Sequence, residues 1–77
     1  MRKVYVQVNA VFSPEGEITP KSFVWEDGRV YSIDKVFEHR KAASLKVGGH
    51  GMRYKCRVMG KEVYLFLEDG RWFIEGV

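Results

Sequence analysis

Cysteine, histidine and proline are scarce in this sequence. The low numbers of cysteine and histidine argue against a disulfide-stabilised domain and against a metal site. There is one cysteine, Cys56. A single thiol cannot form an intrachain disulfide, so the chain is not a disulfide-stabilised secreted domain and fits a reducing cytosol. His39 and His50 are the two histidines, and no C-x-x-C or H-x-x-x-H spacing is present, so we expect no metal site. We therefore expect a cytoplasmic protein with neither metal nor cofactor.

Long apolar runs are also missing. No stretch approaches the roughly 20 apolar residues of a membrane-spanning helix, and Gln7 and Asn9 interrupt the N-terminal segment MRKVYVQVNA. The sequence therefore predicts no signal peptide and no membrane segment. The 77 residues predict one domain, 1–77, which buries only about 60–65% of its unfolded surface.

Positive charge is concentrated in the middle of the chain. Residues 35–61 carry eight lysines and arginines against one acid, a net charge of +7, whereas residues 1–34 carry −1 and residues 62–77 carry −3. Such asymmetry indicates an anionic partner and says little about the fold.

Alternation with a period of two dominates the sequence and indicates strands. Val4, Val6 and Val8 alternate with other side chains, and the segment SPEGE that follows has the composition of a turn. A second strand is expected over residues 18–25. The tetrapeptide EDGR occurs at 26–29 and again at 68–71. Asp-Gly favours a type I′ hairpin turn, which needs φ > 0 at both central residues.

Two hairpins are therefore expected, one pairing Trp25 with Val30 and the other pairing Leu67 with Trp72. The repeated tetrapeptide is either a weak duplication or two independent uses of a favoured turn.

Residues 34–47 are ambiguous. We favour a long, bent strand from 29 to about 41, and the alternative is a short helix that begins at Asp34 and ends before Gly48.

The last three strands can be placed in register, with Arg57 opposite Glu62, Phe66 opposite Phe73 and Tyr64 opposite Glu75. This register collects the apolar side chains on one face, and a slip of one residue would scramble them. The expected core face is Met52, Tyr54, Cys56, Val58, Val63, Leu65, Leu67, Trp72 and Ile74. The expected opposite face is Arg53, Lys55, Arg57, Glu62, Tyr64, Phe66, Phe73 and Glu75.

These patterns predict an all-β fold of five to six antiparallel strands. The sheet is expected to curl into a small barrel of the SH3-like type, or to form a strongly twisted meander, because both arrangements protect the strand edges.

The mixed face carries the main candidate site. Arg53, Lys55 and Arg57 recur about every 6.6 Å along a strand. Cations that follow phosphates, beside aromatic rings that stack on bases, are typical of single-stranded nucleic-acid binding. The neighbouring rings are Tyr64, Phe66 and Phe73. The alternative is that the first strands or a second subunit cover these rings, which would make them a second core layer.

A second candidate is the glycine-rich segment KVGGHG. Its backbone N–H groups, with Lys46 and His50, could bind an anion. The alternative is a connector whose glycines supply unusual backbone angles. Neither of the glycine-rich nucleotide-binding spacings, G-x-x-x-x-G-K-[ST] or G-x-G-x-x-G, is present.

The sequence does not indicate an enzyme. It contains no recognisable pairing of a nucleophile with a base, and Cys56 falls on the expected core face, where a thiol is inert. Non-specific nucleic-acid binding through the mixed face is the first hypothesis. The alternative is a protein-interaction or homodimerisation module that uses the same face.

One further clue is a resemblance that covers nearly the whole chain. The pattern SFVWEDGRVYSIDKVFEHR…GMRYKCRVMGKEVYLFLEDGRWFIE resembles a family of small, uncharacterised bacterial (Firmicutes-type) all-β proteins. That resemblance implies a similar length and fold but no activity. The motifs Phe23-x-Trp25 and Tyr31-x-Ile33-x-x-Val36 are also similar to an unannotated domain encoded beside translesion-polymerase-like proteins, which implies a role near nucleic acid. The tryptophan-rich segment of that domain is replaced here by AASLKVGGHG.

Overall fold

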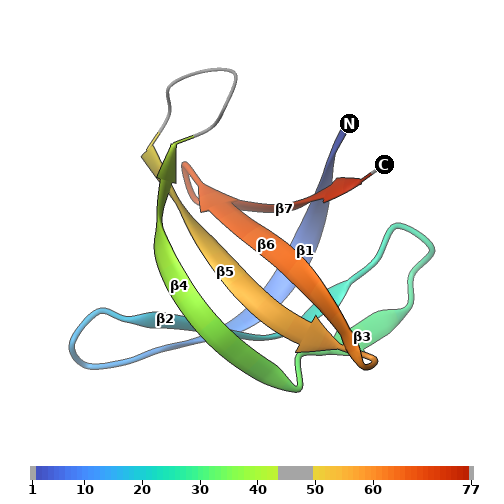
Figure 1. The fold of residues 1–77 in the computed structure, drawn as a ribbon, viewed down its shortest axis with the longest axis horizontal. Helices are drawn as coiled ribbons and strands as arrows, with labels where there is room; N and C mark the ends of the chain where they lie inside the picture. Colours follow the sequence, from blue (N-terminus) through green and yellow to red (C-terminus); the bar gives the residue numbers. More distant parts are fainter. Residues whose placement is uncertain (1, 44–49, 77) are drawn as a thin grey trace.

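The computed structural model describes residues 2–43 and 50–76, and they form seven strands. Figure 1 shows them as one strongly curled sheet. The strands are β1 (Arg2–Phe12), β2 (Ile18–Val24), β3 (Val30–Ser32), β4 (Lys35–Ala43), β5 (His50–Val58), β6 (Lys61–Glu68) and β7 (Arg71–Gly76). No part of the described chain forms a helix long and apolar enough to cross a membrane.

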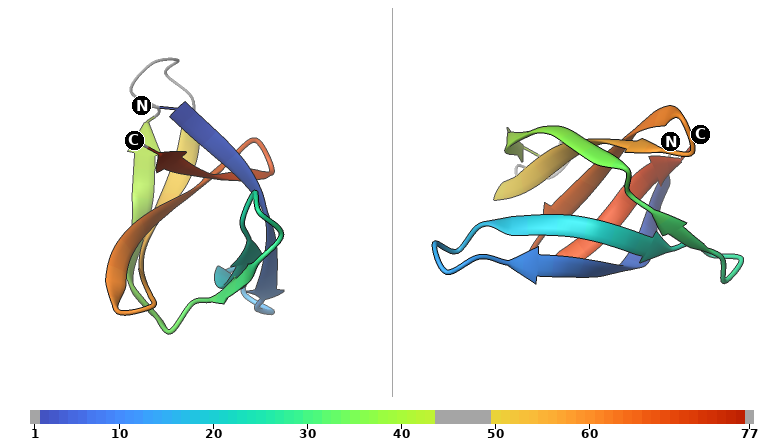
Figure 2. Two further views of the ribbon diagram at one scale, coloured as in Figure 1. Left: turned by 90° about the vertical axis from the view of Figure 1, so that its right-hand side faces the viewer. Right: turned by 90° about the horizontal axis from the view of Figure 1, so that it is seen from below.

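The sheet has the order β3-β2-β1-β7-β6-β5-β4, and its paired strands are antiparallel. Its two edge strands, β3 and β4, follow each other directly in the sequence. At the link between them the N–H of Asp34 donates to the carbonyl oxygen of Arg57, at 2.9 Å. The link therefore joins the two edges at one end, and the sheet becomes the half-barrel seen in Figure 2.

The expectation of an antiparallel all-β fold is confirmed, but the expected strand count of five to six is wrong. The long strand expected over residues 29 to 41 is two strands, β3 and β4, separated at Ile33 and Asp34. Residues 35–43 are strand, so the helix alternative fails over this range, and residues 44–47 lie outside the described part of the chain.

The turns agree with the sequence in one hairpin and differ in another. Asp69 and Gly70 have φ values of 52° and 76°, as a type I′ turn requires. At the first EDGR only Gly28 has a positive φ, 87°. The loop there is longer, because β2 and β3 pair Val24 with Val30. The expected pairing of Trp25 with Val30 is therefore wrong by one residue.

The core lies inside the half-barrel. Five buried residues form its centre, namely Phe23, Tyr54, Cys56, Val58 and Leu65. The remaining members of the predicted core face pack against this centre, so that prediction is confirmed. The predicted register of β5 against β6 is also confirmed, including Arg57 opposite Glu62. Alternation along β5 then directs its basic side chains to the other side of the sheet.

Candidate nucleic-acid interface

The candidate site is the outer surface of strands β4, β5 and β6, opposite the core. We call it the outer face and define it by Lys35, Phe37, Arg40, Arg53, Lys55, Arg57, Glu62, Tyr64 and Phe66. Arg53, Lys55 and Arg57 alternate along β5 with the buried Tyr54, Cys56 and Val58, so their side chains lie on the side of the sheet opposite the core.

Two pairs of like charges face each other across β4 and β5. Lys35 is the direct partner of Arg57, and Arg40 is the direct partner of Arg53. Like charges in opposed positions of an antiparallel pair are destabilising. The face therefore contains repulsion that the fold alone does not require.

Acidic residues neutralise part of this charge. Glu62 pairs with Lys55 at 3.6 Å, and Glu38 pairs with Arg40 at 3.2 Å. Within residues 2–43 and 50–76, no ion pair joins Lys35, Arg53 or Arg57 to an acid. These three side chains are the cations most available to an anionic ligand.

A β-bulge brings an aromatic ring among the cations. The register of β4 against β5 shifts between Val36 and Glu38, so Phe37 is the extra residue. The cationic groups of Lys35, Lys55 and Arg57 lie 5.4, 6.0 and 5.2 Å from the centre of its ring. Its exposed fraction is 36%, so the ring remains partly accessible among three positive charges.

Tyr64 is the second accessible ring of the face. Its exposed fraction is 42%, and the guanidinium carbon of Arg53 lies 4.8 Å from its ring centre. Both accessible aromatic rings of the outer face thus have a cation beside them. Such cation–π contacts hold the long basic side chains near the rings.

Phe73 differs from this pattern, because its exposed fraction is 3%. Its ring stacks on Phe66 at 5.0 Å, meets Tyr5 edge-on at 5.6 Å, and lies 4.7 Å from the ammonium of Lys3. Phe73 is therefore in a second core layer, which was the alternative for the aromatic residues. Of the three rings predicted for the site, Tyr64 is exposed, Phe66 is half-buried and Phe73 is buried.

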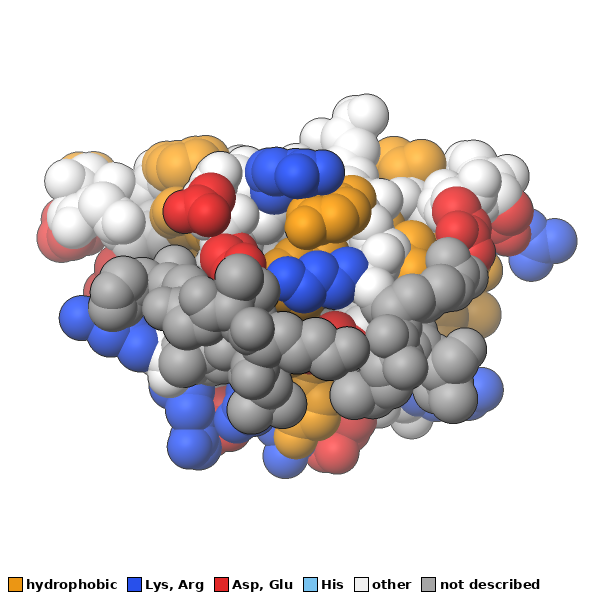
Figure 3. Space-filling view, turned by 90° about the horizontal axis from the view of Figure 1, so that it is seen from above, with side chains coloured by type: hydrophobic (Ala, Val, Ile, Leu, Met, Phe, Trp, Pro, Cys, Tyr) orange, Lys and Arg blue, Asp and Glu red, His pale blue; other side chains and the backbone are white. Residues whose placement is uncertain are grey.

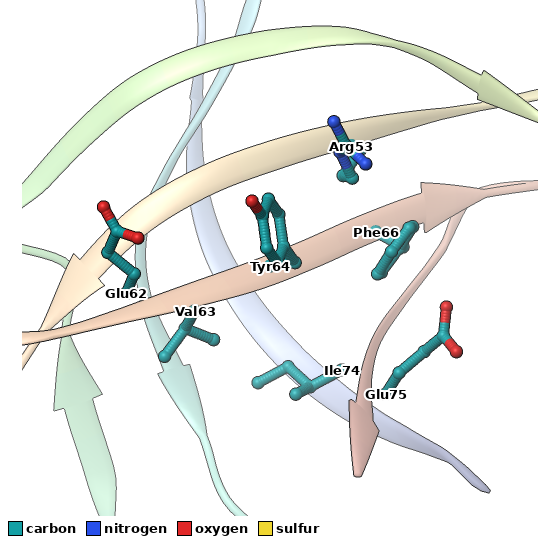
Figure 4. A pocket seen from close by; sticks show the side chains of 7 residues that line it. All are labelled: Arg53, Glu62, Val63, Tyr64, Phe66, Ile74 and Glu75. Carbon is teal, nitrogen blue, oxygen red and sulfur yellow. The ribbon is translucent and has the colours of Figure 1, made fainter. Parts of the chain in front are cut away.

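An open hollow continues the outer face where β6 and β7 diverge. The ladder between these strands runs from Glu68–Arg71 to Leu65–Ile74 and does not reach Tyr64 and Glu75, so the predicted Tyr64–Glu75 pair is wrong. The space holds about 470 Å³, and Figure 4 shows the side chains around it. They are Arg53, Glu62, Val63, Tyr64, Phe66, Ile74 and Glu75.

Figure 3 shows the molecule from above, with lysine and arginine side chains beside hydrophobic ones. On β7 and β1, the guanidinium carbon of Arg71 lies 3.8 Å from the ring centre of Tyr5. Lys3 pairs with Glu68 at 3.6 Å. Tyr5 and Lys3 lie on β1 and Arg71 lies on β7, outside the β4–β6 surface that defines the outer face.

Two groups with raised pKa values, Cys56 and Tyr54, lie in the core. Burial raises the pKa of the Cys56 thiol to about 11. Burial, and then the nearby Cys56, raise the pKa of Tyr54. The Cys56 sulfur lies 3.7 Å from the carbonyl oxygen of Tyr54. A protonated, buried thiol of this kind is not a nucleophile at neutral pH.

The remaining predicted site residues, Lys46 and His50, belong to the glycine-rich segment KVGGHG. His50 begins β5 opposite Ala43, whereas Lys46 and most of the segment KVGGHG lie outside the described residues. Three residues of the outer face were not predicted: Lys35, Phe37 and Arg40. All three belong to the positively charged segment 35–61, which the sequence had indicated. The side of the sheet to which their side chains point depends on the β-bulge in β4, which the alternation of residue types does not reveal.

No group of three or more acidic, histidine or cysteine side chains among the described residues could hold a metal ion. Comparison of the chain with family models, with curated proteins and with solved structures found no match. The geometry of the outer face is therefore the basis for any functional conclusion.

Proposed function

We propose that the protein binds single-stranded nucleic acid on the outer face. The observation that carries this proposal is the pair of opposed like charges, Lys35 with Arg57 and Arg40 with Arg53. Each opposed pair costs stability, on the order of 0.2–1 kcal/mol. A polyanion that lies across the outer surface of β4 and β5 would reduce this repulsion, so the opposed cations would favour the bound state.

The spacing of the cations suits a chain of phosphates. Arg53, Lys55 and Arg57 follow one another along β5 at intervals of about 6.6 Å. Lys35 and Arg40 widen the track onto β4. Neutralising several phosphates releases condensed counterions, so the affinity is expected to fall steeply as salt is added.

The two accessible rings favour a single strand over a duplex. Phe37 and Tyr64 are partly exposed among the cations, and each base that stacks on such a ring contributes about 1–3 kcal/mol. In a duplex the base faces are already stacked on each other and are not available to these rings. Preference for single strands is therefore the property that separates this site from a merely basic surface.

Fluorescence anisotropy with labelled single-stranded and duplex oligonucleotides tests the proposal. The variant R53A/R57A is expected to bind the single strand at least tenfold more weakly than the unmodified protein. The control K21A/R29A has the same net charge, because it removes two exposed cations from the β2–β3 side. It is expected to bind within twofold of the unmodified protein.

Three outcomes would contradict the proposal. They are the absence of binding at low salt, equal losses in the two charge-matched variants, and equal affinity for single strands and duplexes. The alternative from the sequence, a homodimerisation module, predicts that sedimentation shows a dimer at micromolar concentration. It also predicts that R53A/R57A shifts that dimer towards monomer without any effect of oligonucleotide.

A further inference from the structure

The ribbon in Figure 1 shows the β5–β6 turn and β3 at the same end of the half-barrel. An apolar pocket is lined by residues from both. It holds about 370 Å³, a volume within the range of small-molecule sites. Its walls come from β2 and the loop after it, β3, the β5–β6 hairpin and β7. The lining residues are Phe23, Trp25, Tyr31, Val58, Met59, Lys61, Val63 and Ile74.

Met59 at the rim is unusual in two ways. Its φ is +52°, in the left-handed region that β-hairpin turns normally fill with Asn, Asp or Gly. Its side chain is also 75% exposed although it is apolar. The other two-residue turn of the sheet has the same backbone angle at Asp69, φ +52°, where the residue type suits the turn. Strained residues of this kind concentrate at functional sites.

Three aromatic side chains line the pocket, and one of its described lining residues is charged. Phe23 and Tyr31 stack with ring centres 5.6 Å apart, and Trp25 completes an aromatic wall. Among the described lining residues, Lys61 carries the single charge. None of these described lining residues is an acid, so a ligand with one negative group beside a ring would meet a complementary charge.

We propose that this pocket binds a small aromatic monoanion. The ring of the ligand packs among Trp25, Tyr31 and Met59, and its acidic group contacts the ammonium of Lys61. The flexible thioether of Met59 adapts to the shape of the ring. This accounts for an exposed apolar residue in a turn that disfavours it. The pocket shares Val63 and Ile74 with the hollow beside the outer face, but none of its lining residues belongs to the outer face itself. The proposal does not depend on the proposed nucleic-acid binding.

Titration of the ¹⁵N-labelled protein with 2-naphthoate, followed by NMR, tests this proposal. The protein has two tryptophans, and their indole N–H signals report on different places. Trp25 lines the pocket, whereas Trp72 packs against Tyr54 in the core at 5.4 Å between ring centres. The Trp25 signal is expected to shift in a saturable way, and the Trp72 signal is expected to change little.

Two variants separate the parts of the site. Met59→Asn keeps the turn and removes the apolar rim, so the affinity for 2-naphthoate is expected to fall at least fivefold while the melting temperature stays equal or rises. Lys61→Gln is expected to abolish the preference for 2-naphthoate over its neutral analogue 2-naphthalenemethanol. A merely structural role for Met59 would not combine higher stability with weaker binding.

The proposal is overturned by any of three results. The first is that 2-naphthoate does not shift the Trp25 indole signal at millimolar concentration. The second is that Met59→Asn binds the probe as tightly as the unmodified protein. The third is that Lys61→Gln retains the preference for the anion. Saturable binding that both variants weaken as described supports it.

Discussion

Lys35 and Arg57 occupy directly opposed positions in the β4–β5 ladder, and both extend over the ring of Phe37. Their cationic groups lie 5.4 and 5.2 Å from that ring centre. The ring attracts each cation, while the two cations repel each other. The result is a small positive site on an exposed edge strand, whose charges are held near each other by the bulge at Phe37.

Replacing Lys35 by glutamate is expected to stabilise the protein. The change converts a repulsive cross-strand pair with Arg57 into an attractive one, and the expected gain in the free energy of unfolding is about 0.5–1 kcal/mol. Urea unfolding at low ionic strength measures it. The same variant is expected to bind single-stranded oligonucleotide more weakly.

Lys35→Gln serves as the matched control, because it removes the repulsion without adding attraction. Its stability is expected to lie between those of the unmodified protein and K35E. A loss of stability in K35E would contradict the assignment of repulsion between Lys35 and Arg57.

Phe73 and Tyr64 are expected to respond in opposite ways to truncation. Phe73→Ala opens a cavity in the second core layer and is expected to cost about 3–5 kcal/mol of unfolding free energy. Tyr64→Ala is expected to cost under about 1 kcal/mol, as is usual for surface positions. Tyr64→Ala is nevertheless expected to weaken oligonucleotide binding by about 1–3 kcal/mol, because it removes a stacking ring.

Urea unfolding and anisotropy on both variants check this contrast. If Phe73→Ala does not fold, Phe73→Leu gives a smaller cavity and the same comparison. Equal stability losses at the two positions would contradict the position of Phe73 in the second core layer.

Cys56 is expected to resist modification. Burial raises its pKa to about 11, so little thiolate is present at pH 8, and the side chain is 1% exposed. Reaction with 5,5′-dithiobis(2-nitrobenzoate) is expected to be slow in the folded protein and fast in urea. A rapid stoichiometric reaction without denaturant would contradict the buried position.

The same pKa shift predicts that stability declines in alkaline solution. The unfolded thiol loses its proton near its ordinary value of 9.0, while the folded thiol keeps its proton until about pH 11. The folded state therefore binds more protons between these values, and the free energy of unfolding falls as the pH rises through them. The raised pKa of Tyr54 acts in the same direction. Cys56→Ala is expected to reduce the slope, as urea titrations at pH 8 to 11 would show.

Met59–Gly60 and Asp69–Gly70 are two-residue turns with positive φ at both positions. Exchanging their first residues tests how the residue type affects stability. Met59 and Asp69 share a φ of 52°, and a left-handed residue other than Gly, Asn or Asp costs on the order of 1–2 kcal/mol. Met59→Asn is expected to raise the free energy of unfolding by about 1 kcal/mol, and Asp69→Met to lower it by a similar amount. Thermal unfolding measures both, and a destabilised Met59→Asn would show that the side chain of Met59 is required for the fold.

Much of the fold could be predicted because strand alternation is a local property. The register of β5 against β6 follows from keeping Cys56 and Leu65 on one side, and the Asp69–Gly70 turn follows from its residue types. The strand count was wrong because nothing in the local pattern marks Ile33 and Asp34 as a break between two strands. The length of the first EDGR loop was missed for a similar reason, since the same four residues form two different turns.

The candidate site was only partly predictable. The basic residues of β5 were found from their alternation. Phe37 was not found, because its position depends on a bulge that is visible only once β4 is paired with β5. The burial of Phe73 depends on Tyr5 and Lys3, which lie at the other end of the chain.

By itself the sequence determined the all-β class, the core face of the last three strands and the concentration of positive charge, because composition and short-range alternation carry that information. Only the tertiary structure decided that β1 lies beside β7 and that the two edge strands meet at Asp34. It also decided which rings are exposed and which cations oppose each other. These properties depend on contacts between segments distant in the chain, and no local pattern encodes them.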